Sequence, residues 1–184
     1  MVSITALWLP ILVSAAVVWV LSAIVWMALW HKKDFKKLPD EEAVRAALKG
    51  QNPQPGQYWI PWADQQSMKD ETVKQKYQEG PVAIMTVMQP GVPSMGKGMG
   101  LSFVYYLVAG IFVAYIASRH LAPGVDYLAV FRLTSVVAFL AYGFGIMQDA
   151  IWFGRPWGFS IKIWIDAFIY GLFTGGVFGW MWPS

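Results

Sequence analysis

The chain contains 184 residues, of which 57% are hydrophobic, 16% are aromatic and only 14% are charged. Soluble domains carry about 25% charged residues, so this composition favours a protein whose solvent is a lipid bilayer. The net charge of +3 is small and dispersed, which argues against a nucleic-acid-binding surface. The sequence has no cysteine and only two histidines, His31 and His120, which argues against disulfides and metal or haem centres. We therefore expect no metal and no cofactor other than bound lipid.

Residues 1–30 contain no charged side chain and form the first predicted transmembrane helix. A bilayer span needs about 20 apolar residues, and proline is tolerated in the first turn of a helix, where Pro10 falls. A cleaved signal peptide would have a basic start and a shorter apolar core followed by small residues. This segment lacks the basic start and ends on Trp26 and Trp30, so we expect a retained helix.

Residues 31–99 form the only extended polar region, and its first residues set the predicted topology. Four lysines follow the first helix directly: Lys32, Lys33, Lys36 and Lys37. By the positive-inside rule, this side of the membrane is cytoplasmic. Binding of anionic lipid is the alternative role for these lysines.

Two helices are predicted in this polar region. The first starts after Pro39 with three acids, ends near Lys49 and has Gly50 as its C-cap. The second runs over residues 64–79 with Asp64 as its N-cap. Between and after them, residues 57–60 and 81–88 are predicted strands that pair. This α+β-like segment has few apolar residues for a core, so we expect it on the membrane surface or against a partner.

Residues 91–98, GVPSMGKG, match only the first part of a phosphate-binding loop. Gly91, Gly96 and Lys97 are in place, but the serine or threonine that should follow the lysine is replaced by Gly98. The next helix is apolar and enters the membrane. We interpret this stretch as a membrane-entry loop.

Three further apolar stretches, about residues 100–118, 127–148 and 159–182, predict a three-helix transmembrane bundle over residues 100–184. With the N-terminus outside, twelve basic residues fall on the inner side and only two, Arg119 and Arg132, on the outer side. We therefore predict an all-α membrane protein of four transmembrane helices with both termini on the periplasmic side. Arg132 is interpreted as an interfacial anchor, with a functional cation as the alternative.

Four ionisable residues are predicted at the cytoplasmic ends of the last two helices: Asp149, Arg155, Lys162 and Asp166. Lys162 and Asp166 are four positions apart, share one helix face and are predicted to form an ion pair. A patch of this kind usually fixes helices at the interface, and it is also a candidate for moving protons or binding an anionic headgroup. Asp166 lies too near the helix start for a relay at mid-membrane.

The last helix carries the predicted helix-packing residues Gly171, Gly175, Gly176 and Gly179. Three of them recur at every fourth position in two overlapping GxxxG patterns, so they share one helix face. Glycine lets helix backbones approach closely, and two patterns in register indicate a packing face. Its partner is either another helix of this chain or another chain.

Tryptophans and one arginine mark the predicted membrane interfaces. These anchors are Trp8, Trp30, Arg132, Trp152, Trp157, Trp180 and Trp182. Stacking of the tryptophans on a bound pigment, quinone or sterol is the alternative.

Three stretches carry a resemblance to known sequences: PDEEAVRAALKG (39–50), GPVAIMTVMQPGVPSMGKG (80–98), and IWFGRPW with IDAFIYGLFTGGVFGWMWP (151–157 and 165–183). Together they are similar to a family of small bacterial inner-membrane proteins with no known activity. The resemblance implies a multi-pass protein of the bacterial inner membrane, and it brings no catalytic or cofactor-binding residue.

The sequence therefore predicts a non-enzymatic integral membrane protein that acts as a scaffold or accessory subunit of a larger membrane complex. Its expected partners are membrane lipids and other membrane-protein subunits or a second copy of itself, and not nucleic acid. The alternative is a small transporter, or a lipid- or quinone-binding protein, that uses the predicted patch of Asp149, Arg155, Lys162 and Asp166.

Overall fold

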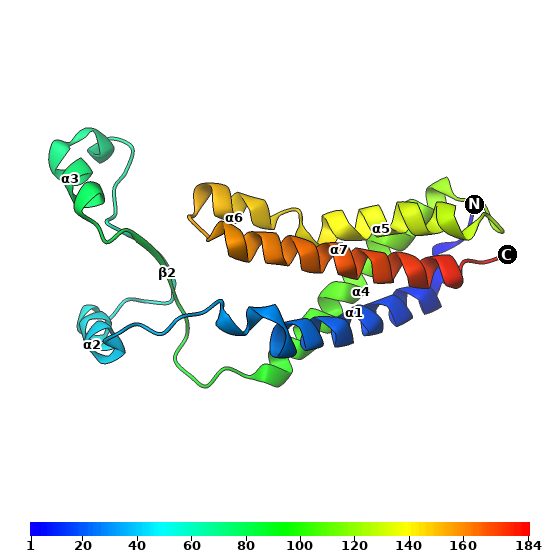
Figure 1. The fold of residues 1–184 in the computed structure, drawn as a ribbon, viewed down its shortest axis with the longest axis horizontal. Helices are drawn as coiled ribbons and strands as arrows, with labels where there is room; N and C mark the ends of the chain where they lie inside the picture. The colour runs from blue at the N-terminus through cyan, green and yellow to red at the C-terminus, as the bar shows by residue number, and fades with distance from the viewer. The chain divides into compact units, whose positions relative to one another are not determined.

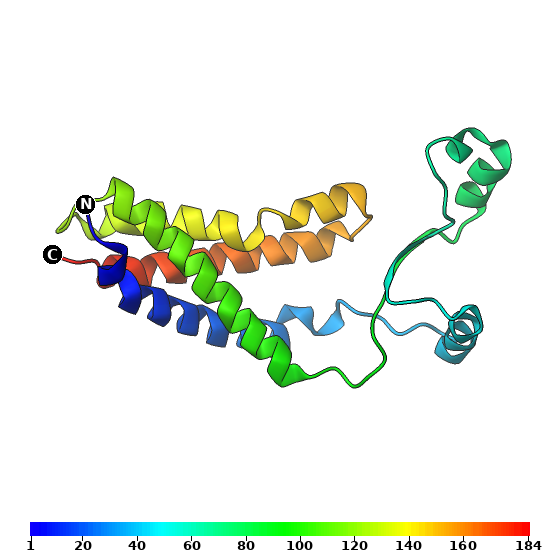
Figure 2. The same cartoon turned by 180° about the vertical axis from the view of Figure 1, so that it is seen from behind.

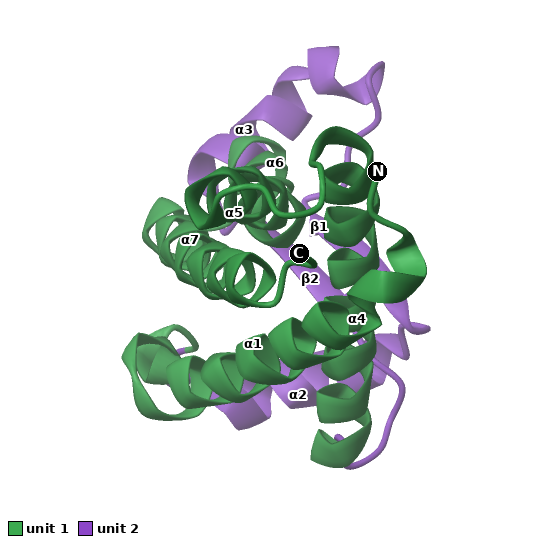
Figure 3. Ribbon diagram, turned by 90° about the vertical axis from the view of Figure 1, so that its right-hand side faces the viewer, with its two compact units in different colours: residues 1–35, 94–184 green, residues 36–93 purple.

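The computed structural model describes all 184 residues, which form two compact units (Figure 3). One unit comprises Met1–Phe35 and Ser94–Ser184 and is called the bundle. The other is Lys36–Pro93 and is called the middle segment.

Four helices of the bundle are long and apolar enough to cross a membrane, as the sequence predicts. The first is α1 (Trp8–Ala28), which continues the short 3-10 turn η1 (Ile4–Leu7) and precedes the turn η2 (Trp30–Lys33). The others are α4 (Met95–His120), α5 (Tyr127–Gly143) with its short continuation α6 (Ile146–Trp152), and α7 (Trp157–Trp180).

Within the bundle, α5 and α7 lie side by side along most of their length, while α1 contacts both α4 and α7 (Figures 1 and 2). Both termini lie at the end where α4 turns into α5 (Figure 1), and there the Trp182 indole donates to the Ala122 carbonyl at 3.0 Å. The main apolar core is also at this end and includes the fully buried Leu7, Val113 and Phe178. Many large apolar side chains lie on the outside, as expected for helices that face hydrocarbon.

The predicted glycine face of α7 packs against α5. A Cβ on Gly171 would lie 2.9 Å from the Ser135 carbonyl oxygen, and one on Gly179 would lie 2.7 Å from the Tyr127 ring. Non-bonded heavy atoms of neighbouring helices do not approach this closely, so only glycine permits the observed distance between the two backbones. The sequence left open whether this face packs against a helix of the same chain or of another chain. In the structure it packs against a helix of the same chain.

Two helices of the bundle differ from their predicted limits. Helix α4 begins at Met95, earlier than expected, because the Ser94 hydroxyl caps it by accepting a hydrogen bond from the Lys97 amide at 3.2 Å. Lys97 therefore lies in the first turn of a helix, and the predicted membrane-entry loop ends before it. The third predicted span is interrupted after Gly143, where α5 ends, and resumes as α6.

The middle segment contains α2 (Glu41–Gln51), the turn η3 (Ser67–Lys69), α3 (Glu71–Glu79) and a two-stranded antiparallel sheet of β1 (Gly56–Ile60) and β2 (Ala83–Val87). The predicted pairing of the two strands is confirmed, with Tyr58 opposite Met85. None of the residues of this segment is buried. The sheet is therefore small and solvent-exposed, and an α+β domain with a core of its own is not formed.

Two predicted helix caps in the middle segment are wrong. Helix α2 runs through Gly50 and ends at Asn52, whose left-handed backbone (φ 47°) asparagine tolerates better than most residues. Helix α3 starts after Asp70, whose carboxylate accepts hydrogen bonds from the Thr72 amide and hydroxyl at 2.9 Å. Asp64 lies before the turn η3 instead, where its carboxylate accepts a hydrogen bond from the Ser67 amide at 2.7 Å.

Candidate functional site: a buried histidine–carboxylate cluster

The chain leaves α1 through the turn η2, and this turn directs His31 into the bundle. Helix α1 ends at Ala28, the next residue Leu29 has a non-helical backbone (φ −99°, ψ −125°), and the 3-10 turn follows at once. His31 is only 4% exposed, whereas the neighbouring Lys32 and Lys33 are exposed. Side chains three positions apart eclipse in a 3-10 turn, so Asp34 follows on the same side as His31.

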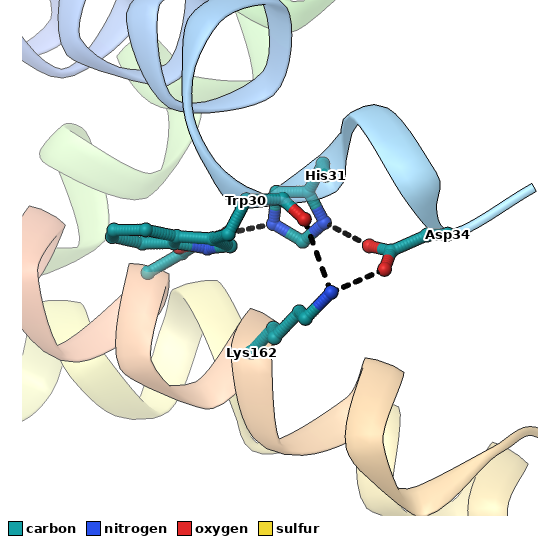
Figure 4. Close-up of polar contacts among 5 residues, drawn as sticks. Trp30, His31, Asp34 and Lys162 are labelled. Carbon is teal, nitrogen blue, oxygen red and sulfur yellow. Dashed lines mark hydrogen bonds and ion pairs between the residues drawn. The ribbon is translucent and has the colours of Figure 1, made fainter.

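The His31 ring lies between two carboxylates, and Figure 4 shows its contact with one of them, Asp34. Its Nδ1 atom is 2.5 Å from Asp34 Oδ2, and its Nε2 atom is 2.6 Å from Oδ2 of Asp166 in α7. Asp166 is 1% exposed, and its second oxygen accepts a hydrogen bond from the Trp30 indole at 3.0 Å. Every polar atom of the buried imidazole and of the Asp166 carboxylate is therefore paired, which compensates for their loss of hydration.

Lys162 of α7 completes the cluster at the second carboxylate oxygen of Asp34 (Figure 4). Its ammonium donates to the Trp30 carbonyl at 3.0 Å and forms an ion pair with Asp34 Oδ1. The predicted pair between Lys162 and Asp166 is not formed, because Asp166 binds His31 of η2 and Lys162 binds Asp34, the residue after this turn. The hydrogen bond from Lys162, reinforced by His31 and opposed by burial, holds the pKa of the Asp34 carboxyl below its usual value.

Aromatic rings shield the imidazole from solvent. The Trp26 indole stacks on the His31 ring with centroids 4.1 Å apart and planes inclined by 11°, and the Phe159 ring packs against it edge-on at 5.9 Å. The guanidinium of Arg155 lies 5.1 Å from the centre of the Phe159 ring. These rings lower the local dielectric around the cluster, so its charges interact more strongly than they would at the surface.

The cluster is neutral when all of its hydrogen bonds are made. Ionised carboxylates only accept, so a ring that donates to both Asp34 and Asp166 carries protons on both nitrogens and one positive charge. That charge and the Lys162 ammonium cancel the two carboxylates. The arrangement fastens the segment after α1 to the start of α7, two parts of the chain that are more than a hundred residues apart.

The four residues of the predicted patch do not converge on one site. Asp149 and Arg155 form a separate ion pair at 3.2 Å, with both side chains partly exposed. Lys162 and Asp166 belong to the His31 cluster. Their membership of one functional patch therefore has no geometric support.

Most of the predicted interfacial anchors lie on the surface of the bundle. The exposed ones are Trp8, Arg132, Trp152, Trp157 and Trp180. Trp182 is partly buried and bonded to Ala122, as described for that end of the bundle. Trp30 differs from the others because its indole binds Asp166 and its carbonyl binds Lys162, so it has a structural role within the cluster.

Sequence reasoning missed His31 and Asp34 as site residues. The available signal was their spacing of three, directly after the first span, at the level where the last helix begins. The lysines around them are explained by the positive-inside rule alone, so the two residues were interpreted as part of a topology signal. Without the fold, nothing in the sequence distinguishes the inward-facing His31 from its solvated neighbours Lys32 and Lys33.

The polar interior continues from the cluster into the bundle. Tyr170, one helical turn beyond Asp166, is 6% exposed, and its hydroxyl has no hydrogen-bond partner in the protein. Its ring packs edge-on against Tyr106 and Tyr142, with centroids 6.4 Å away in both cases. The Tyr142 hydroxyl is bonded to the Thr174 hydroxyl at 3.1 Å.

Neither a family model, nor a curated protein, nor a solved structure matches this sequence. The similarity to a bacterial inner-membrane family therefore stays a prediction.

Proposed function

We propose that this chain is a non-enzymatic accessory subunit of a membrane complex, in which the middle segment binds a protein partner. The observation that carries the proposal is that none of the residues in Lys36–Pro93 is buried. A segment of this length needs buried apolar surface to offset the conformational entropy that ordering it costs. A binding partner supplies that burial.

The middle segment also displays large apolar side chains that a free soluble surface rarely carries together. Trp62 is 77% exposed and Val92 is 96% exposed. Trp59 and Ile60 of β1 and Ile84 of β2 add exposed apolar groups to the small sheet. Aromatic residues of this kind are enriched where proteins bind one another.

The charge of the middle segment favours a protein partner over an anionic lipid surface. The segment contains seven lysines and arginines and seven aspartates and glutamates, so its formal net charge is zero. Electrostatic attraction to anionic lipid contributes about 1 kcal/mol per basic residue near the surface and needs an excess of them. A neutral surface with exposed aromatic groups fits another protein better.

Hydrogen exchange tests the proposal on the full-length chain. In the complex extracted with mild detergent, the amides of β1 and β2 should exchange at least tenfold more slowly than in the purified chain. Trp62→Ser should abolish both this protection and the higher mass in native mass spectrometry. Trp180→Ser removes an equally exposed tryptophan from the bundle and serves as the control.

Two results would contradict the proposal. One is a strictly monomeric chain after mild extraction, with rapid exchange throughout the middle segment. The other is full protection of β1 and β2 when the purified chain is placed in protein-free lipid discs, because lipid alone would then cover the segment.

We also infer a bacterial inner-membrane location with both termini on the periplasmic side. The bias of twelve basic residues against two between the predicted inner and outer sides supports the orientation, and the similarity to a bacterial inner-membrane family supports the location. Because the chain has no cysteine, single cysteines report topology cleanly. Phe35→Cys should react with a membrane-impermeant maleimide only in inverted vesicles, and Ala122→Cys only in right-side-out cells. The reverse pattern would overturn the orientation.

A small transporter is less well supported. Asp149 and Arg155 form one ion pair, whereas Lys162 and Asp166 belong to the separate His31 cluster. The opposite end of the bundle is filled by four fully buried apolar side chains, Leu7, Val113, Val130 and Phe178. A continuous polar route through the bundle would have to replace that apolar core.

A further inference from the structure

We propose that the cluster of His31, Asp34, Asp166 and Lys162 is a proton-binding site that reversibly fastens the end of α1 to α7. Binding of one proton closes the contact, and its release opens it. This property goes beyond the accessory role and is independent of any partner of the middle segment.

The geometry requires two protons in the two contacts of the imidazole. The distances of 2.5 Å to Asp34 and 2.6 Å to Asp166 are those of strong hydrogen bonds, and ionised carboxylates supply no proton to either. If one of the two protons leaves, a nitrogen lone pair faces a carboxylate oxygen at the same distance. That contact is repulsive, so it must lengthen.

The surroundings make the release of this proton costly in the closed state. The charged groups that face the imidazole are Asp34 from its own turn and Asp166 with Lys162 from α7. Loss of the proton changes the formal charge of this set from zero to minus one in a site shielded by Trp26 and Phe159. A buried net charge is strongly unfavourable, and separation of α1 from α7 relieves it by admitting water.

Groups farther out do not replace the lost charge. Arg155 contacts the ring of Phe159 and is paired with Asp149. Tyr170, one helical turn after Asp166 in α7, packs edge-on against Tyr106 of α4, and neither phenol brings a positive charge. The proton shared by the imidazole is therefore the one that decides the charge of the cluster.

Only a short part of the chain depends on this contact. Val18 and Val25 of α1 pack with Tyr170 in an apolar cluster that holds the middle of the helix. Beyond Val25, the end of α1 and the turn η2 are joined to α7 by the polar cluster and by the rings around Phe159. Release of the proton is thus expected to move η2 while the rest of the bundle remains assembled.

Histidine NMR measures the proton directly. The chain has only two histidines, so ¹⁵N-histidine labelling of the protein in lipid discs gives two ring signals, with exposed His120 as the reference. We expect the His31 ring to carry two N–H protons while it contacts both carboxylates and one when the contact is open, in a single reversible step. A His31 ring that carries the same number of N–H protons in both states would overturn the proposal.

Spin labels measure the movement. Labels on Phe35→Cys and Ile161→Cys, both at exposed positions, report the separation of η2 from α7. In the otherwise unchanged chain the label separation should increase over the pH range in which His31 loses its proton. No change over that range would refute the proposed opening.

Asp166→Asn is the decisive variant because the asparagine side chain has nearly the same volume as that of aspartate. The asparagine oxygen still accepts from Trp30, and its amide donates to His31 Nε2, so a ring with a single proton on Nδ1 satisfies both contacts. The pH response of the label separation should therefore disappear, with the contact closed throughout. Asp149→Asn removes a carboxylate outside the cluster and should leave the response intact. A response that survives in Asp166→Asn, or that is lost in Asp149→Asn, would overturn the assignment.

Discussion

Gly175 of α7 lies directly against Ser135 of α5, so closely that a Cβ on the glycine would be 1.9 Å from the serine hydroxyl oxygen. The Phe131 carbonyl oxygen would be 2.8 Å from the same atom. No rotation of the serine removes the clash with the carbonyl, because the carbonyl belongs to the backbone. The distance between α5 and α7 is therefore set by the absence of a side chain at this position.

Gly175→Ala should destabilise the bundle by about 1–3 kcal/mol, because the added methyl group forces α5 and α7 apart. The measurement is reversible unfolding in mixed micelles. Gly176→Ala is the matched control, since the nearest atom to a Cβ there is 3.8 Å away. Alanine also favours helix over glycine by about 1 kcal/mol, so the control should be neutral or slightly stabilising. Equal behaviour of the two variants would refute close packing at Gly175.

Asp166→Ala should lower the stability of the bundle by about 3–5 kcal/mol, because it leaves the buried His31 ring and the Trp30 indole without their acceptor. The same unfolding assay measures the loss. Asp149→Ala breaks an exposed pair and should cost less than about 1 kcal/mol. Similar losses in the two variants would show that Asp166 is far better hydrated than its 1% exposure indicates.

Tyr170→Phe should stabilise the bundle by up to about 1 kcal/mol. The hydroxyl is buried without a partner, and an unsatisfied buried donor costs about 1–3 kcal/mol, part of which the phenylalanine recovers. Tyr142→Phe is the matched control, because it removes a hydroxyl that is bonded to Thr174, and it should be destabilising. A loss of stability in Tyr170→Phe would instead reveal a bound water or ligand at that hydroxyl.

Acidification should release the N-terminus of α3. The hydrogen bonds from Thr72 lower the pKa of Asp70 below its usual value of 3.8. Because the folded pKa is the lower one, this capping contribution is fully present above about pH 4 and is lost as the pH falls through the lowered value. Exchange of the α3 amides should accelerate at that point.

Asp70→Asn supplies the control for this pH dependence. Asparagine caps helices about as well as aspartate and does not titrate in this range. The amides of α3 should then show no acid-induced step. A step of the same size in the variant would assign the effect to another group.

Much of the fold is predictable from local sequence. Four apolar stretches with basic flanks predict the four long helices, because a bilayer fixes their length and excludes their charge. The strands β1 and β2 follow from β-prone residues bounded by glycine and proline. The caps at Asn52 and Asp70 were not predicted, because several residues that can cap a helix occur near each other in the sequence. The backbone conformation at each position decides which of them is the cap.

The candidate site shows where local sequence stops being informative. Asp166 stands out in the sequence as a charge near the start of a span. The i, i+4 rule predicts that it forms an ion pair with Lys162. That rule describes an isolated helix, where no other partner competes. In the folded bundle, His31 and Asp34 offer buried contacts from another part of the chain, and these replace the local pair.

The sequence by itself determined how many apolar helices this protein has, which of their ends carry the basic charge, and that α7 has a face free of side chains. The tertiary structure alone decided that this face meets α5, and that His31 joins Asp34 to Asp166. The physical reason is that hydropathy and small-residue spacing are properties of one segment. A close backbone contact or a buried hydrogen bond exists only when two distant segments are brought together.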